Sequence, residues 1–206
     1  MRTEAINLSL ERTISRARLS KYLDVTDNNL DEALSLYERN IRLSEALYTT
    51  FQGLEVCLRN SINHELRTRY GDDWMENVTT PLDGAAIDQI QKAIQELNNP
   101  SHDAVVAELK FSFWVGLLGP RYDQSLWRSA LYKGFAGTSG KKRRDVHRRM
   151  NALRRFRNRV AHHEPIYDRA QQMHAEALEA IEWMCRDTHA WVAACSKFED
   201  VYNTQP

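Results

Sequence analysis

Apolar side chains recur at steps of three or four residues along most of this sequence, which is the spacing of one face of an α-helix. The longest such series is Leu30, Leu34, Tyr37, Ile41, Leu47, Phe51, Leu54, Leu58, Ile62 and Leu66. Asp27 or Asn28 is placed to cap its start, and Gly71 is placed to end it. We therefore expect a helix of up to about 40 residues, roughly 60 Å long. We expect it to bend at Gly53, and to project from the globule or pack along a partner.

Shorter helical patterns follow, separated by turn residues. They predict helices over 83–97, 101–118 and 168–185, and a short helix that begins near 187 and reaches Trp191. They also predict a basic helix over roughly 141–163, with a buried stripe of Val146, Met150, Leu153, Phe156 (or Arg157) and Val160. No stretch shows the period of two that marks a strand. We therefore expect an all-α single domain over 1–206, with short flexible tails at 1–12 and 199–206.

The composition excludes several classes of protein. With 206 residues, 42% of them hydrophobic, the chain can bury a substantial core, so wholesale disorder is excluded. The longest uncharged run, from Phe111 to Pro120, is about half of the roughly 20 residues that a membrane span needs. Charged residues interrupt the first 25 positions, so we expect no signal peptide. Three scattered cysteines, interpreted as buried small hydrophobes, are too few for a disulfide framework or a zinc site, which favours the reducing cytoplasm.

A neutral total charge conceals a strongly polarised chain. The sequence holds 28 basic and 28 acidic residues. Between Lys141 and His163 lie ten Lys or Arg residues against Asp145 alone, so this segment carries 10 − 1 = +9 and the remainder 18 − 27 = −9. Local charge decides whether a phosphate backbone is attracted, so the basic helix is a candidate site for nucleic acid.

The end of this basic helix carries the strongest candidate for chemistry. Arg157, Asn158 and His162 lie close together in the sequence. Histidine can take and give a proton near neutral pH, and arginine presents a permanent fork of donors to phosphate oxygens. These two groups suffice to cleave RNA without a metal, because the 2′-hydroxyl of the RNA is itself the nucleophile. Asn158 and His162 share a helix face, so the amide can orient the imidazole.

Arg157 and His162 are five positions apart, which places them about 140° apart around a regular helix. They converge only if the helix is distorted, if the long arginine reaches around it, or if two copies of the motif face each other. The third alternative makes a composite site at a dimer interface. His162 also lies in the last turn, where the helix dipole favours the imidazolium form.

The string Arg157-Asn158-x-x-x-His162 resembles the R-x4–6-H motif of the HEPN superfamily of ribonucleases. Its extension from Arg157 through Tyr167 is similar to the Abi-like (AbiD/AbiF) family, as are Leu36-Tyr37 with Asn40, the stretch Leu54 to Asn60, and Phe111 to Trp114. The resemblance runs over most of residues 15–195. It implies a HEPN helical bundle, metal-independent RNA cleavage by Arg157 and His162, a homodimer, and a role in abortive infection or as a toxin. An antitoxin or a regulatory RNA is a further candidate partner.

Each candidate also has a purely structural interpretation. The basic helix is either a solvated surface or an RNA-binding face, with Arg148, Arg149, Arg154, Arg155 and Arg159 as the candidate phosphate contacts. His163 is either a second proton carrier or the helix cap, and we favour the cap. Glu55, Arg59 and Asn60 are polar residues in an otherwise apolar helix, and are either partners of His162 across the bundle or salt-bridged surface groups. The aromatic residues at positions 111, 113, 114, 127, 183 and 191 are expected in the core.

Three functions follow from these residues. The leading hypothesis is a metal-independent endoribonuclease, and the alternative is a noncatalytic HEPN module that binds RNA or a protein partner. A structural dimerisation protein is the third class. No spacing of His, Cys, Asp and Glu typical of a metal site and no phosphate-binding glycine pattern is present in the sequence, so neither a metal nor a cofactor is expected.

Overall fold

The computed structural model describes residues 2–98, 100–138 and 140–204, and over these residues it is all-α, without a strand. The elements are α1 (Glu4–Ile14), α2 (Arg16–Val25), α3 (Leu30–Tyr70), α4 (Gly84–Leu97), α5 (His102–Glu108), α6 (Phe111–Leu117), η1 (Pro120–Tyr122), η2 (Asp123–Trp127), η3 (Leu131–Thr138), α7 (Arg143–Ala161), α8 (Ala170–Met184), α9 (Arg186–Cys195) and α10 (Phe198–Asn203). This confirms the predicted fold class. None of the described helices has the length and apolarity that a bilayer crossing requires.

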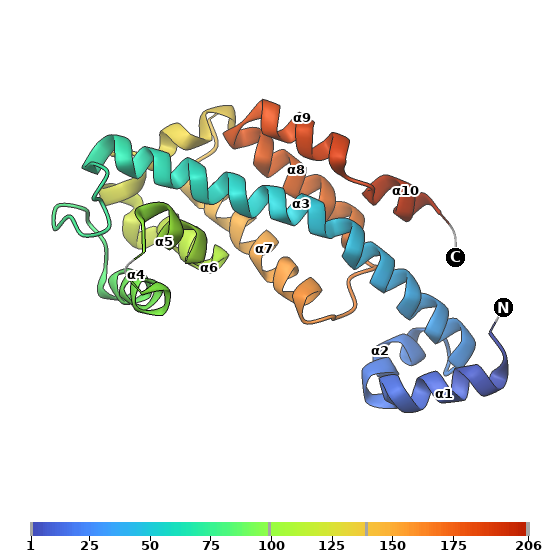
Figure 1. The fold of residues 1–206 in the computed structure, drawn as a ribbon. Helices are drawn as coiled ribbons and strands as arrows, with labels where there is room; N and C mark the ends of the chain where they lie inside the picture. The colour runs from blue at the N-terminus through green and yellow to red at the C-terminus, as the bar shows by residue number, and fades with distance from the viewer. Residues whose placement is uncertain (1, 99, 139, 205–206) are drawn as a thin grey trace.

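The long helix α3 is the axis of the molecule (Figure 1). It runs for 41 residues and ends at Gly71, whose φ of 97° suits a residue without a side chain. Its N-cap is Asn29, whose side-chain oxygen accepts hydrogen bonds from the backbone N–H groups of Asp31 and Glu32. The expectation that Asp27 or Asn28 caps the helix is therefore wrong, because both form the left-handed turn that precedes it.

Gly53 does not bend α3, which is helical through this position. A Cβ atom at residue 53 would lie 2.5 Å from Cγ2 of Val192 in α9, closer than two carbon atoms can approach. The glycine instead allows α9 to pack directly against the backbone of α3. The predicted bend is wrong because the missing side chain makes room for a neighbouring helix and leaves the hydrogen bonds of α3 intact.

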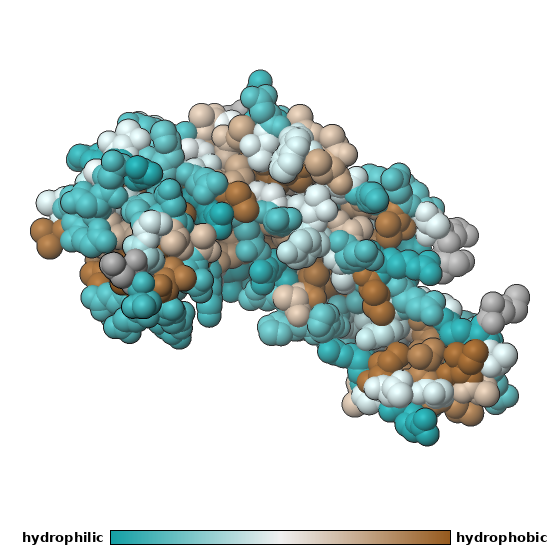
Figure 2. Space-filling model, in the orientation of Figure 1, coloured by the Kyte–Doolittle hydropathy of each residue, from teal (hydrophilic) through white to brown (hydrophobic). Residues whose placement is uncertain are grey.

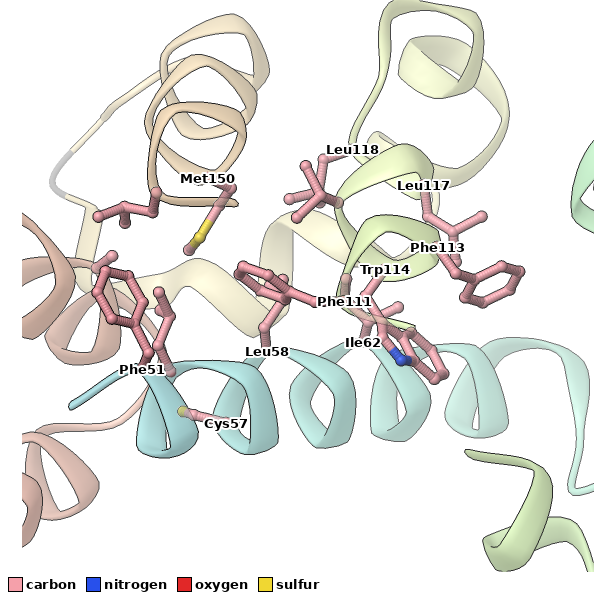
Figure 3. Close-up of a cluster of buried hydrophobic side chains, with 14 of the residues drawn as sticks. Phe51, Cys57, Leu58, Ile62, Phe111, Phe113, Trp114, Leu117, Leu118 and Met150 are labelled. Carbon is pink, nitrogen blue, oxygen red and sulfur yellow. The ribbon is translucent and has the colours of Figure 1, made fainter. Parts of the chain in front are cut away.

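The main core lies between α3, α6, α7 and α8. Figure 3 shows Phe51, Leu58 and Ile62 of α3 beside side chains of α6 and Met150 of α7. The stripe predicted for the basic helix is confirmed for Val146, Met150, Leu153 and Phe156, with Val160 partly buried. On α3 the buried row runs through Leu43 and Leu47, so Ile41, expected in the core, is 51% exposed on the adjacent face.

The N-terminal helices α1 and α2 cover the end of α3 that projects from the main bundle (Figure 1). They form a second core, in which Leu19, Tyr22 and Leu23 pack against Ala33 and Leu34. The expectation of a flexible tail over 1–12 is therefore wrong. Figure 2 shows hydrophobic residues gathered on this end of the molecule.

Arg2 ties the N-terminus to α3. Its guanidinium contacts Asp31, Ser35 and Glu38, and Asn7 donates a further hydrogen bond to Asp31. At the other end of the chain, residues 198–203 form α10, which packs on α3, so the second predicted tail is also wrong. Residues 1, 205 and 206 of these two tails lie outside the described residues.

The helix predicted over 101–118 is interrupted. Ser101 is the N-cap of α5, but Leu109 and Lys110 adopt extended backbone conformations and a new helix, α6, begins at Phe111. The indole N–H of Trp114 donates a hydrogen bond to the carbonyl of Leu109 at 3.1 Å. The buried Trp114 side chain therefore satisfies a backbone carbonyl that the break leaves without a helical partner.

Candidate functional site

The candidate motif lies in the turn that closes α7. The helix ends at Ala161, and His162 is its C-cap, with its backbone N–H donating to the carbonyl of Asn158 at 2.9 Å. His163 follows with a φ of 56°, in the left-handed region that often ends a helix. The expectation that His163 caps the helix is therefore corrected: His162 holds that position.

A buried asparagine holds this turn from the side. Asn40 of α3 is 3% exposed, and its amide donates to the carbonyl of Glu164 at 3.2 Å. Its side-chain oxygen accepts from the backbone N–H of Ile166 at 2.7 Å. Both polar ends of one amide therefore bind the backbone just beyond the two histidines, which fixes the path of the chain there.

Two arginines also hold the backbone of this turn. Arg18 of α2 donates to the carbonyls of His162 and His163, each at 3.4 Å. Arg159 of α7 donates to the carbonyl of Pro165 and lies 3.5 Å from the carboxylate of Glu164. The motif backbone is thus held by α2, α3 and α7, which leaves the imidazoles to be positioned by their own rotamers.

Arg157 faces α3 from the last turns of α7. Its Nε donates to Oε1 of Glu55 at 2.5 Å. Both residues line a groove of about 850 Å³ between α3 and the end of α7. The other residues along this groove come mainly from α3: Tyr37, Asn40, Ile41, Ser44, Glu45, Tyr48, Phe51, Gln52, Val56, Arg59, Val160, Ala161 and His163. Glu55, predicted as a partner of the motif, therefore contacts its arginine rather than its histidine.

The groove brings Arg157 together with His163 and not with His162. His163 is among its lining residues, whereas His162 is exposed at the cap and does not line it. The helix is regular up to Ala161, so distortion does not carry His162 round to Arg157. Among the described residues, no hydrogen bond joins the side chain of Asn158 to that imidazole. The long side chain of Arg157 does not reach around the helix to His162 either, because it pairs with Glu55 of α3. The meeting of two copies is the remaining alternative of the three.

Arg59, a candidate together with Glu55 and Asn60, also lines this groove. It lies one helical turn after Glu55, and its Nε is buried and, within the described residues, makes no hydrogen bond. A buried donor without an acceptor is unfavourable by about 1–3 kcal/mol, so the site is suited to an anion or a water molecule. The spacing of Glu55, Arg59 and the buried Leu58 is the signal that places this arginine beside the groove.

The wall of the groove also exposes apolar side chains. Tyr48 is 69% exposed, and Ile41 and Val56 lie on the same side of α3, each about two helical turns from Tyr48. Large apolar groups of this kind on one face indicate a surface that binds something else.

Most of the predicted phosphate contacts are engaged within the chain. Arg149 pairs with Glu176 and Glu179 of α8 and lies over the ring of Trp183, while Arg148 pairs with Asp145. Burial opposes ionisation of Glu179, but hydrogen bonds from Arg149 and Lys141 lower its pKa.

The remaining predicted arginines differ in how far they are engaged. Arg154 bonds to Asn151, and Arg159 holds the turn after α7. Arg155 makes no ion pair or side-chain hydrogen bond with the described residues. The +9 segment is thus substantially neutralised by acidic partners, and Arg155 remains the predicted phosphate contact without a partner in the described chain.

Asn60 lies apart from this site. It lines a second groove, of about 610 Å³, formed by α3, α9 and η3, so the structure does not bring it near Arg157 or His163. The described residues contain no group of three His, Cys, Asp or Glu side chains arranged to hold a metal ion.

The aromatic residues predicted for the core are buried, except Trp191. The others of this set are Phe111, Phe113, Trp114, Trp127 and Trp183.

Comparison of the chain with protein families, with curated proteins and with solved structures finds no match.

Proposed function

We propose that this protein is a HEPN-type endoribonuclease of the Abi-like class, which cleaves RNA in the cytoplasm without a metal ion. The observation that carries the proposal is the groove in which the Arg157 guanidinium lies with an imidazole, at the end of a helix whose sequence matches the R-x4–6-H pattern. Arg59 adds a second guanidinium to the same groove. Two arginines and a histidine in one concave site are the groups that phosphodiester cleavage needs.

The proposed chemistry uses the nucleophile that RNA already carries. An imidazole accepts the proton of the 2′-hydroxyl, and the 2′-oxygen attacks the adjacent phosphorus. The bond from phosphorus to the 5′-oxygen breaks, and an imidazolium donates a proton to that leaving oxygen. Arg157 stabilises the charge that develops on the two non-bridging oxygens. The products are a 2′,3′-cyclic phosphate and a 5′-hydroxyl.

A homodimer supplies the groups that one chain separates. His162 is exposed at the end of α7, and the apolar residues Ile41, Tyr48 and Val56 line the neighbouring groove. We propose that a second copy packs on this face, so that His162 of one chain works beside Arg157 of the other. His163 is then the second imidazole of each groove.

The experiment is cleavage of a labelled single-stranded RNA in EDTA by the wild-type protein and three variants. We expect Arg157→Ala and His162→Ala to lower the rate by at least about 100-fold, the typical contribution of one acid–base group. The third variant, His163→Ala, distinguishes the role of the His163 imidazole from that of His162. If His163→Ala abolishes cleavage while His162→Ala does not, His163 is the proton carrier and its own groove is the whole site. Full activity in all three variants, or cleavage only with added Mg²⁺, contradicts the proposal.

The biological role proposed with this activity is abortive infection or toxicity, restrained by an antitoxin or a regulatory RNA. Induced expression of the wild-type chain should then arrest growth, whereas the folded His162→Ala variant should not. Growth arrest by both proteins would show that toxicity does not depend on RNA cleavage.

A noncatalytic binding module is the second candidate. It is favoured by the ion pair between Arg157 and Glu55, which satisfies the guanidinium within the chain, and by the position of His162 outside the groove. This function predicts RNA binding that weakens with salt and survives His162→Ala, without any cleavage.

A further inference from the structure

All three cysteines of the chain line one groove, the second of the two described above. Cys57 comes from α3, Cys185 stands at the start of α9 and Cys195 ends the same helix. None of them is in a disulfide, and they range from buried Cys57 to half-buried Cys185 and exposed Cys195. The expectation that all three are buried small hydrophobes is therefore wrong for Cys195.

Cys185 is built into the start of a helix. It is the N-cap of α9, and its sulfur accepts a hydrogen bond from the backbone N–H of Thr188 at 3.4 Å. Hydrogen bonds from the hydroxyl and the N–H of Thr188 lower the pKa of the Cys185 thiol. A thiolate at the N-cap is stabilised by the same free N–H groups that a Ser or Asp cap would satisfy, so this position favours the nucleophilic form.

The other two thiols lack this environment. Burial raises the pKa of Cys57 to about 11, against a smaller opposing effect of Ser61. Figure 3 shows the Cys57 side chain on the side of α3 away from Met150 and Phe111; Cys57 lies at the edge of the core and also lines the groove. Cys195 is exposed at the far end of α9 and has no side-chain hydrogen bond within the described residues. One groove thus contains a thiol at a helix N-cap, a buried thiol and an exposed thiol.

The groove has room and polar groups for a small molecule. Its volume of about 610 Å³ falls within the range of small-molecule sites. Lys133 and His64 line it and can pair with a carboxylate, Glu65 lines it and can pair with an ammonium group, and Trp191, 67% exposed, provides a flat apolar wall. The groove that contains Cys185 therefore offers partners for a small thiol compound that carries both carboxylate and ammonium groups.

We propose that this groove is a thiol-modification site, in which Cys185 undergoes exchange with a small disulfide that carries carboxylate and ammonium groups. The Cys185 thiolate attacks one sulfur of that disulfide, a new sulfur–sulfur bond forms to Cys185, and the other half leaves as a thiolate. Oxidation levels balance, because one disulfide is consumed and one mixed disulfide is formed. The bound half occupies the groove between α3 and α9. Residues Gln52 and Val56 of α3 line both this groove and the one that contains Arg157, so the adduct lies on the opposite flank of the same helix segment.

The test measures which cysteine reacts first at pH 7 with oxidised glutathione, a small disulfide that carries carboxylate and ammonium groups. For each unit by which a thiol pKa falls, the thiolate fraction rises about tenfold and its nucleophilicity falls about threefold, which leaves a net gain of about threefold. We expect Cys185 to form the adduct several-fold faster than Cys195, although Cys195 is the more exposed, and Cys57 to stay unmodified in the folded protein. Intact mass and peptide mapping report the rates.

Thr188→Val is the matched variant, because it keeps the shape of the side chain and removes the hydroxyl donor. It should slow Cys185 and leave Cys195 unchanged. Cys185→Ser should remove the fast phase, and Cys195→Ser should not. If Thr188→Val fails to fold, the comparison of Cys185 with Cys195 in the wild-type chain still decides. Faster reaction at Cys195, or equal rates at both thiols, overturns the proposal. This result does not depend on any activity toward RNA.

Discussion

Arg157 of α7 and Glu55 of α3 form an ion pair across the groove, with 2.5 Å between Nε and Oε1. The pair links residues 102 positions apart in the sequence and fixes the orientation of the motif arginine. It also places a carboxylate where the proposed substrate carries phosphate. The terminal nitrogens of Arg157 are left for that phosphate, whereas the Nε is held by the protein.

Glu55→Gln should tighten RNA binding. The variant removes a negative charge beside the proposed phosphate site and keeps an acceptor for Arg157, so the dissociation constant for single-stranded RNA should fall several-fold at low salt. Fluorescence anisotropy at two salt concentrations measures it. The free energy of unfolding should change by less than about 1 kcal/mol, since the pair is partly exposed. Glu96→Gln on α4 removes the same charge far from the groove, and equal effects of the two variants would argue against RNA in this groove.

Asn40→Ala should destabilise the protein by about 2–3 kcal/mol. The variant leaves the backbone N–H of Ile166 and the carbonyl of Glu164 without their partner, and unsatisfied buried groups are costly. Chemical denaturation measures the loss. Asn60→Ala, on an exposed face of the same helix, is the control and should change stability by less than about 0.5 kcal/mol. Similar losses in both variants would show that the hydrogen bonds of Asn40 to the turn after α7 contribute nothing to stability.

Gly53→Ala should destabilise the contact between α3 and α9. The added Cβ meets Val192 at 2.5 Å, and overpacking of this kind costs about 1–3 kcal/mol, against a gain of about 1 kcal/mol in helix propensity. A second change, Val192→Ala, should recover part of the loss, which a double-mutant cycle measures. Gly116→Ala in α6, where a Cβ meets nothing within 4 Å, should instead be neutral or stabilising. A destabilisation by Gly53→Ala that Val192→Ala fails to relieve would contradict the close approach.

His174 should make folding sensitive to acid. This side chain is 4% exposed, stacks on Phe198 and lies 3.6 Å from Glu199, and burial lowers its pKa from 6.5 to about 4. Between these values the unfolded chain binds a proton that the folded chain does not. Stability is therefore complete above about pH 6.5 and falls by about 3 kcal/mol as the pH approaches 4.

His174→Gln should flatten this part of the stability curve, as measured by denaturation at several pH values. The exposed His64 offers the comparison, because His64→Gln should leave the slope unchanged. A slope that is the same in both variants would assign the acid sensitivity to other groups.

The helical architecture follows from the sequence because apolar spacing and capping residues act locally. This is why the extent of α3 and the buried face of α7 were predictable, down to Met150 and Phe156. The tails were not predictable, because α1 is held by distant contacts such as those of Arg2 with Asp31 and Glu38. Gly53 shows the same limit, because a glycine is needed there to make room for the side chain of Val192 on α9.

The candidate site was predictable only in part. Arg157, His162 and Glu55 stood out by residue type and spacing, but periodicity alone could not show that Glu55 faces the arginine or that His163 lines its groove. Asn40 entered only as part of a resemblance, and its role depends on a turn more than 120 residues later. Arg59 stood out as a polar residue in an apolar stretch, but no sequence pattern reveals that its Nε is buried without a partner among the described residues.

The most direct measurement is the chemistry of the RNA ends that the purified protein produces in EDTA. Mass spectrometry of a short RNA, and of the same RNA with a 2′-deoxy nucleotide at the cut position, reports both the product and the nucleophile. Our account predicts a 2′,3′-cyclic phosphate and a 5′-hydroxyl, no cut at the 2′-deoxy position, and no product from Arg157→Ala. Products with a 5′-phosphate, or cleavage at the 2′-deoxy position, would contradict it.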